Sequence, residues 1–237
     1  MARKVLLICG ILSSILYVGI DILAAVQWAD YSYTSQTVSE MFAIDAPTRT
    51  LVVPLFITYA LLVYAFGLGV WLSAGRSLAL RFVAVGIVGK EVLGLAVTLF
   101  APIHLRGIEG TLSDTMHGIL TIAGVLFILL AVGFGSAAFG TRFRIYSIVT
   151  ILLLVVFGIM TGLDQPQLAP NLPTPWMGIY ERITIYSYML WVAVLAIMLL
   201  HTGKKQLIIR ESKNDYNNSR FDKAFGKSLV EKNISQS

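Results

Sequence analysis

The chain has 237 residues, of which 57% are apolar and only 13% are charged. A soluble domain carries about 25% charged residues, so this composition excludes a globule surrounded by water and indicates a chain solvated by lipid. The net charge of +5 comes from basic residues that flank apolar runs without interleaved aromatic residues, which argues against a nucleic-acid partner.

Six apolar segments are long enough to cross a bilayer as helices, because about 20 mostly apolar residues span the hydrocarbon core. They cover about residues 5–27, 51–73, 78–100, 116–139, 145–163 and 179–200. A helix satisfies its own backbone hydrogen bonds in lipid, whereas an unclosed sheet does not. The sequence therefore predicts an all-α fold, a six-helix transmembrane bundle within a membrane domain of residues 1–202.

The connections between these segments differ in length and charge. The two tight turns are residues 74–78 and 140–144, and the three long loops are residues 28–50, 101–115 and 162–178. Basic residues gather at the N-terminus, in the tight turns and in the C-terminal tail, while the opposite side has only Arg49, Arg106 and Arg182. The positive-inside rule therefore predicts that both the N-terminus and the C-terminus are cytoplasmic and that the long loops face outward.

Residues 203–237 form a basic cytoplasmic tail in this scheme. Residues 211–220 are too polar to pack a core and are expected to be disordered. Beyond them, Phe221, Phe225 and Leu229 recur every four residues beside lysines. This spacing fits either a short amphipathic helix on the inner leaflet or a disordered tail.

Three ionisable residues fall inside predicted spans, Asp21, Lys90 and Glu91. Charges in the hydrocarbon region are costly, which makes them functional candidates by default. The helix rise places Asp21 and Lys90 at similar depths, so the lysine can reach the aspartate if their helices touch. Adjacent residues point about 100° apart on a helix, so Lys90 and Glu91 are not expected to face one partner. A structural ion pair and a proton relay both stay open.

A second polar group gathers at the outer ends of the spans. Asp114 and His117 are three residues apart at the start of the fourth span, and Glu181 and Arg182 open the sixth. A carboxylate beside a histidine serves general-base catalysis and metal ligation. Asp114 also fits a helix cap, because an acid stabilises the positive end of the helix dipole. One histidine with scattered acids is a weak metal signature, so no metal or cofactor site is predicted.

The first outer loop adds Ser39 and Glu40 to this group. We predict a ligand-binding set at the outer membrane face, formed by Glu40, Asp114, His117, Glu181 and Arg182. For catalysis the candidates are His117 as base, Asp114 as its orienting group and Ser39 as nucleophile. This assignment requires that the nucleophile and the base come within hydrogen-bond reach.

Three short motifs between the spans carry a family resemblance. They are Tyr33-Thr34-Ser35-Gln36-Thr37-Val38-Ser39-Glu40 followed by Ala46-Pro47-Thr48-Arg49, then Asp114-x-x-His117, then Gly178-x-x-Glu181-Arg182. In order and placement they resemble the bacterial integral-membrane family called domain of unknown function 998, over about residues 5–200. The resemblance implies a six-span protein of the bacterial cytoplasmic membrane and assigns no activity. It also implies that Ser39, Glu40, Asp114, His117, Glu181 and Arg182 are the family's functional or structural polar set.

Four functions are compatible with these patterns. The first is a membrane protein that binds a small molecule or lipid head group in an outward-facing polar pocket. The second is an intramembrane lipid hydrolase or transferase that uses Asp114 and His117. The third is a transporter with an Asp21–Lys90 relay, against which the absence of clear broken helices argues. The fourth is a structural membrane subunit, in which the polar residues join helices.

Overall fold

The computed structural model describes residues 1–202, which form helices and loops. The first five long helices are α1 (Ala2–Gln27), α2 (Arg49–Ala74), α3 (Leu78–Phe100), α4 (Leu112–Ala138) and α5 (Thr141–Asp164). A sixth, named the last helix below, begins at Met177 and is described to Thr202. Two short 3₁₀ helices lie in the loops, η1 (Ser39–Phe42) and η2 (Gln165–Gln167). All six long helices are long and apolar enough to cross a membrane, which confirms the predicted fold class.

The fourth and fifth helices begin about four residues before the predicted spans. The first turn of α4 is polar and is closed by a capping box, in which Thr111 and Asp114 bond each other's backbone N–H groups. The first turn of α5 carries Arg142 and Arg144. Helix therefore extends beyond the apolar segment at both points, because backbone hydrogen bonding and capping continue where hydropathy stops. The predicted tail, residues 203–237, lies outside the described residues.

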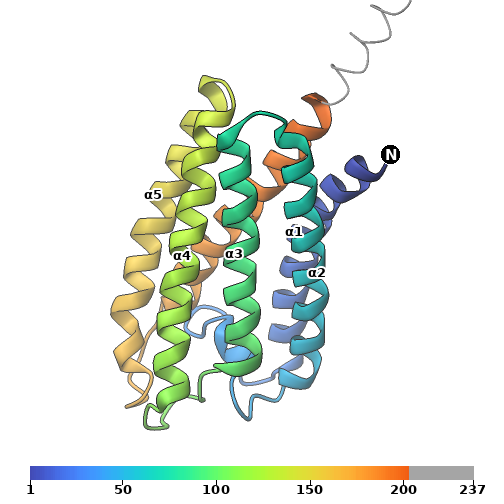
Figure 1. The fold of residues 1–237 in the computed structure, drawn as a ribbon. Helices are drawn as coiled ribbons and strands as arrows, with labels where there is room; N and C mark the ends of the chain where they lie inside the picture. The colour runs from blue at the N-terminus through green and yellow to red at the C-terminus, as the bar shows by residue number, and fades with distance from the viewer. Residues whose placement is uncertain (203–237) are drawn as a thin grey trace, which may run out of the picture. The chain divides into compact units, whose positions relative to one another are not determined.

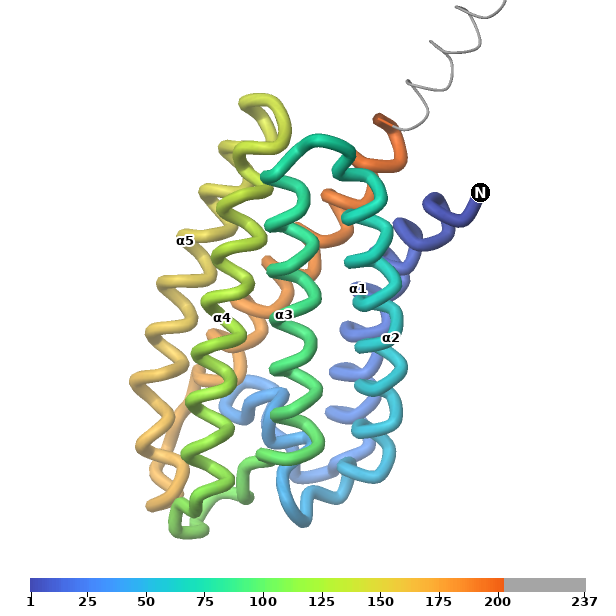
Figure 2. Tube along the Cα trace, in the orientation of Figure 1, coloured from blue at the N-terminus to red at the C-terminus, as the bar shows by residue number. Residues whose placement is uncertain are grey.

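The chain divides into two units, Met1–Ile197 and Met198–Ser237, and the bundle belongs to the first. Helices α1 to α5 pack in chain order, each against the next (Figure 1). The last helix runs behind this row (Figure 2). It contacts α1 where Ser14 Oγ donates to the Met189 carbonyl at 2.9 Å, and α5 where Trp191 Nε1 donates to Ser147 Oγ at 3.0 Å. The last helix thus joins the two ends of the row.

Successive helices run in opposite directions, so the connections gather at two ends of the bundle. The N-terminal end of α1 and both tight turns lie at one end, and the three long loops lie at the other (Figure 1). We name these the turn end and the loop end. The loops contact one another, because the amide of Ile44 donates to the Ile103 carbonyl and the amide of Gly107 donates to the Leu168 carbonyl. All residues predicted for the outer polar group therefore belong to the loop end.

Glycine allows α3 and α4 to approach closely. A Cβ atom at Gly86 would lie 2.8 Å from the Cβ of Ala131 and 2.8 Å from the carbonyl oxygen of Phe127. One turn further on, a Cβ atom at Gly89 would lie 2.6 Å from the Phe127 ring. Small residues at a helix contact let backbones meet without voids, which is the usual basis of helix association in lipid.

We expect Gly86→Ala to destabilise the bundle, because its new methyl group meets a backbone carbonyl that cannot move independently. Overpacking of this kind lowers the free energy of unfolding by about 1–3 kcal/mol. Thermal unfolding of the purified protein in detergent measures the effect. Gly133→Ala on α4 is the matched control, since a Cβ atom there meets nothing within 4 Å. Equal unfolding of the two variants would contradict the close packing.

Candidate functional site

A buried ion pair joins α1 to the last helix. Arg182 bonds Asp21 through both oxygens, Nε to Oδ2 at 3.0 Å and Nη2 to Oδ1 at 2.9 Å. Asp21 is 0% exposed and Arg182 is 3% exposed, and the hydroxyl of Tyr186 also donates to Asp21. A two-point contact between planar groups is the strongest common form of ion pair. Asp21 therefore faces Arg182, in place of the lysine at position 90 that similar depth suggested.

The first loop closes over this pair. Arg182 Nη1 donates to the carbonyls of Tyr33 and Gln36 at 2.8 and 2.9 Å, and Nη2 donates to the Tyr31 hydroxyl at 2.6 Å. The Tyr33 hydroxyl donates to Asp21 Oδ2 at 2.9 Å. Burial raises the pKa of the Tyr31 phenol and of the Tyr33 phenol, so both stay protonated at neutral pH. The guanidinium is thereby fully engaged in holding helices and loop together.

Gly178 makes this approach possible. A Cβ atom at this position would overlap the carbonyl oxygens of Gln36 and Tyr33 and would crowd Arg182 Nη1. The amide of Ile179 donates to the Thr34 carbonyl at 3.2 Å. The first turn of the last helix therefore lies directly against the first loop, and only a residue without a side chain fits there.

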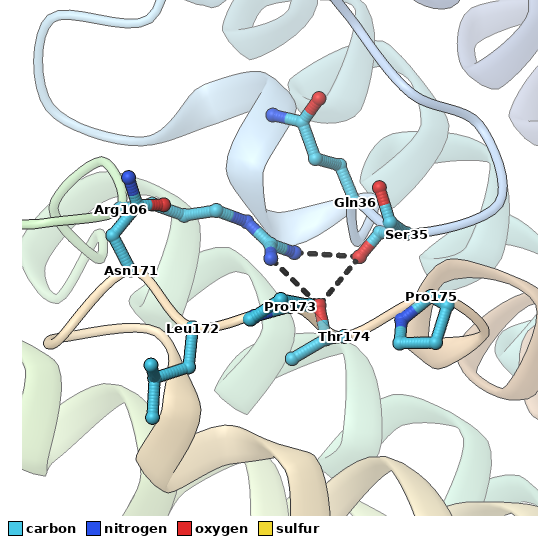
Figure 3. Close-up of a pocket in the computed structure, with 8 residues that line it drawn as sticks. All are labelled: Ser35, Gln36, Arg106, Asn171, Leu172, Pro173, Thr174 and Pro175. Atoms are coloured by element: carbon cyan, nitrogen blue, oxygen red, sulfur yellow. Dashed lines mark hydrogen bonds between the residues drawn. The ribbon is translucent and has the colours of Figure 1, made fainter.

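A second ion pair joins the three loops. Arg106 bonds Glu40 at 2.6 Å through Nε and at 3.0 Å through Nη2, and Glu40 is only 1% exposed. Arg106 also donates to Thr174 Oγ1 at 2.6 Å and to the Ser35 carbonyl. Figure 3 shows the guanidinium pointing toward Ser35 and Thr174 beside a surface hollow of about 410 Å³. One side chain from the second loop thus holds the first and third loops.

Asp114 closes the start of α4 and fixes the second loop. Its Oδ1 accepts from the amide of His104 at 2.8 Å, and its Oδ2 contacts His104 Nδ1 at 2.9 Å. The same Oδ2 accepts from the amide and hydroxyl of Thr111. His117 instead bonds the Ala101 carbonyl through Nδ1 at 2.9 Å. The expectation that Asp114 orients His117 is therefore corrected, because a backbone carbonyl does so.

A cavity of about 610 Å³ lies within the bundle at the loop-end half. Side chains from all six helices and the first loop line it, and its walls are mainly apolar. Ser39, His117 and Glu181 are among the polar residues that line it beside the loops. Glu181 accepts from the amide of Val38 and, at 3.4 Å, from Ser39 Oγ. Of the predicted ligand-binding set, His117 and Glu181 face the cavity, whereas Glu40, Asp114 and Arg182 hold the framework around it.

Lys90 and Glu91 also line this cavity. Lys90 Nζ lies 3.0 Å from Glu91 Oε2. The two side chains leave the helix in different directions, but the lysine is long enough to fold back to its neighbour. The ammonium also lies 5.3 Å from the ring centroid of Tyr59 and 6.0 Å from that of Tyr188. The buried hydroxyl of Tyr188 has no hydrogen-bond partner within the part of the chain that the structure describes. This region therefore holds a neutral ion pair and a free hydroxyl group.

The cavity reaches the outer surface of the bundle along α4 and α5. Ile122 and Leu126 of α4 line it and are 67% and 62% exposed, and Ile159 of α5 lines it and is 59% exposed. In a membrane-spanning helix such exposed apolar side chains face lipid. The cavity is therefore accessible from the side of the bundle, along α4 and α5.

Several functional contacts were not predicted from the sequence. His104, Arg106 and Tyr186 were not proposed as site residues, and Tyr31 and Tyr33 were not connected to Asp21. Arg106 did carry a signal, since it is one of three basic residues on the side of the long loops. Among residues 1–202, no group of three or more His, Cys, Asp or Glu residues could hold a metal ion.

The fold and the site define a multi-pass membrane protein with a polar framework at one end and a largely apolar internal cavity. The chain belongs to the family described as protein of unknown function (DUF998), whose family model matches residues 11–198. This match confirms the resemblance seen in the loop motifs. Neither a search of curated proteins nor a search of solved structures finds a match to the chain.

We expect Asp21→Asn to lower the free energy of unfolding by about 3–5 kcal/mol, because it leaves the Arg182 guanidinium buried without a counter-charge. Chemical unfolding in detergent measures the loss. Asp30→Asn, at an exposed position, is the control. The double variant Asp21→Leu with Arg182→Met should lose less than the sum of its single substitutions, since both charges leave together. A loss equal to that of Asp30→Asn would show that the pair does not stabilise the bundle.

We expect Arg106→Gln to separate the three loops while the helices persist. The substitution leaves Glu40 buried without its cation, a change that costs about 3 kcal/mol where the partner stays desolvated. Limited proteolysis should cut the loops several-fold faster, and circular dichroism should show unchanged helix content. Arg76→Gln, in an exposed tight turn, serves as control. Protection equal to wild type would refute the role assigned to Arg106.

Proposed function

We propose that this protein binds a small amphipathic molecule, of lipid or lipid-like character, in the cavity of the bundle. The observation that carries the proposal is that Ser39, His117 and Glu181 line one largely apolar cavity of about 610 Å³. They come from the first loop, α4 and the last helix, so only the fold unites them. Small-molecule sites are typically mainly apolar, occupy about 300–1,000 Å³ and contain a few polar groups that orient the ligand.

The polar residues around the cavity divide between framework and ligand. The guanidinium groups of Arg182 and Arg106 donate hydrogen bonds to Asp21, to Glu40 and to backbone carbonyls. Within residues 1–202, His117 bonds the Ala101 carbonyl through Nδ1. Its Nε2 is therefore the ring atom that would contact a ligand.

The orientation of the site follows from the charges at the turn end. Arg76, Arg81, Arg142 and Arg144 lie in or beside the tight turns, and basic residues next to spans mark the cytoplasmic side. We therefore propose that the loop end faces outward from a bacterial cytoplasmic membrane. The ligand would reach the cavity from the outer side or from the bilayer.

A second candidate function is hydrolysis or transfer of an acyl group. The supporting observation is the hydrogen bond from Ser39 Oγ to Glu181 Oε1 at 3.4 Å inside the cavity, which pairs a nucleophile with a basic group. In this version Glu181 takes the place of His117 as the base, and Asp114, whose two oxygens are occupied by the second loop, takes no part. Ser39→Ala would then retain ligand binding and lose turnover. The transporter hypothesis has less support, because Lys90 lines the cavity while Asp21 is enclosed with Arg182.

We expect Gly158→Leu to block the cavity and weaken binding about tenfold or more, because its side chain would occupy the ligand's volume. Gly158 lines the cavity, and a Cβ atom there meets nothing within 4 Å, so the helix itself tolerates the change. Titration with the neutral lipophilic dye N-phenyl-1-naphthylamine, beside native mass spectrometry of lipids that purify with the protein, measures occupancy.

Gly133→Leu is the control for this measurement, since position 133 is equally open but does not line the cavity. The proposal predicts normal binding in Gly133→Leu and reduced binding in Gly158→Leu. Equal occupancy in both variants would refute ligand binding in this cavity, and a structural role for the polar residues would then account for the protein's architecture.

A further inference from the structure

The cavity has an unbalanced charge. Its charged side chains are Lys90, Glu91 and Glu181. Lys90 and Glu91 form an ion pair at 3.0 Å, so their charges cancel. His117 also lines the cavity. The ordinary pKa of a histidine lies below neutral pH, so its neutral form predominates there. In its carboxylate form, Glu181 therefore adds a negative charge that no other side chain of the cavity wall balances.

Glu181 has no cationic partner among the residues that the structure describes. Its bonds come from the amide of Val38 and the hydroxyl of Ser39, both uncharged donors. The adjacent Arg182 bonds Asp21 through Nε and Nη2, and its Nη1 donates to three backbone carbonyls. The Arg182 guanidinium is therefore not available as a counter-charge for Glu181. A carboxylate beside an apolar cavity is costly unless a cation compensates it.

Aromatic rings line the same cavity as this carboxylate. Phe42 and Phe56 pack edge to face with centroids 5.6 Å apart, and Tyr17 lies 5.3 Å from Phe56. All three residues contribute to the cavity wall. The face of an aromatic ring attracts an organic cation, and the attraction grows where water is excluded. The rings therefore favour the same sign of ligand charge as Glu181.

We infer that the ligand is an amphipathic organic cation, an apolar molecule with a single ammonium-type or phosphonium-type charge, and that Glu181 is its counter-charge. The inference rests on the proposed function and specifies the class of molecule that it binds. The charge of the ligand balances Glu181, and its apolar part lies against the walls formed by α4 and α5. An anionic amphiphile, such as a fatty acid, would add a second negative charge to the cavity and is excluded by the same balance.

The sideways opening suits such a molecule. The exposed residues Ile122, Leu126 and Ile159 line the cavity at the surface that faces lipid. Amphipathic cations concentrate at membrane surfaces because anionic lipids attract them. Entry from the bilayer therefore brings the apolar part in along α4 and α5, with the cation toward Glu181 at the loop end.

Two probes of nearly equal shape and opposite charge test the inference. Tetraphenylphosphonium and tetraphenylborate are titrated separately into the full-length protein in neutral detergent. We expect wild type to bind the phosphonium at least about tenfold more tightly than the borate, because only the phosphonium neutralises Glu181. Glu181→Gln should remove this preference, because the amide carries no charge.

Glu109→Gln, at an exposed position in the second loop, is the matched control and should behave as wild type. Glu181→Asp retains the charge and should retain the preference for the cation. If the neutral dye binds in a manner that Gly158→Leu abolishes while both ions bind equally, the inference is wrong and the proposed function stands. If no probe binds to wild type above the level of Gly158→Leu, the proposed function is wrong as well.

Discussion

The buried pair of Asp21 and Arg182 is the contact on which the loop end depends. In a low-dielectric interior neither charge is tolerated alone, so the loop-end part of α1 and the start of the last helix must lie side by side. The remaining donors of the guanidinium bind the backbone of the first loop. One electrostatic requirement therefore fixes two helices and a loop, and Gly178 provides the space in which they meet.

The same requirement decides which polar residues are available for chemistry. Arg182, Arg106 and Asp114 each bind several framework groups. The acids that pair with the two arginines are buried, and Asp114 caps the start of α4. Glu181 and His117 have fewer partners and border open volume. The division explains how a cluster that looks uniform in the sequence contains both structural and ligand-facing members. It also explains why the carboxylate form of Glu181 has no counter-charge in the cavity, since the adjacent Arg182 is already paired with Asp21.

The position of the cavity connects the fold to the proposed activity. Helices α4 and α5 form its outer wall, and they are the least buried of the six spans. The α3–α4 contact is held tightly at Gly86, so the open volume lies where the packing requirement is weakest. A ligand that is apolar along most of its length and charged at one end matches both the wall and Glu181. Lys90 and Glu91, although costly in lipid, neutralise each other and leave this selectivity intact.

The sequence by itself determined the six spans, their order and the gathering of the three long loops at one end, because hydropathy and helix length depend on local composition. It also identified Asp21, Lys90, Glu91, His117 and Glu181 as residues that need explanation. It could not assign their partners. Asp21 had two candidate partners, Lys90 at a similar depth and Arg182 at the start of the last helix. Only the packing of the last helix against α1 decided between them. The pairing of Glu40 with Arg106 and the different hydrogen-bond partners of Asp114 and His117 depend likewise on how the loops meet, and those contacts exist only once the bundle has closed.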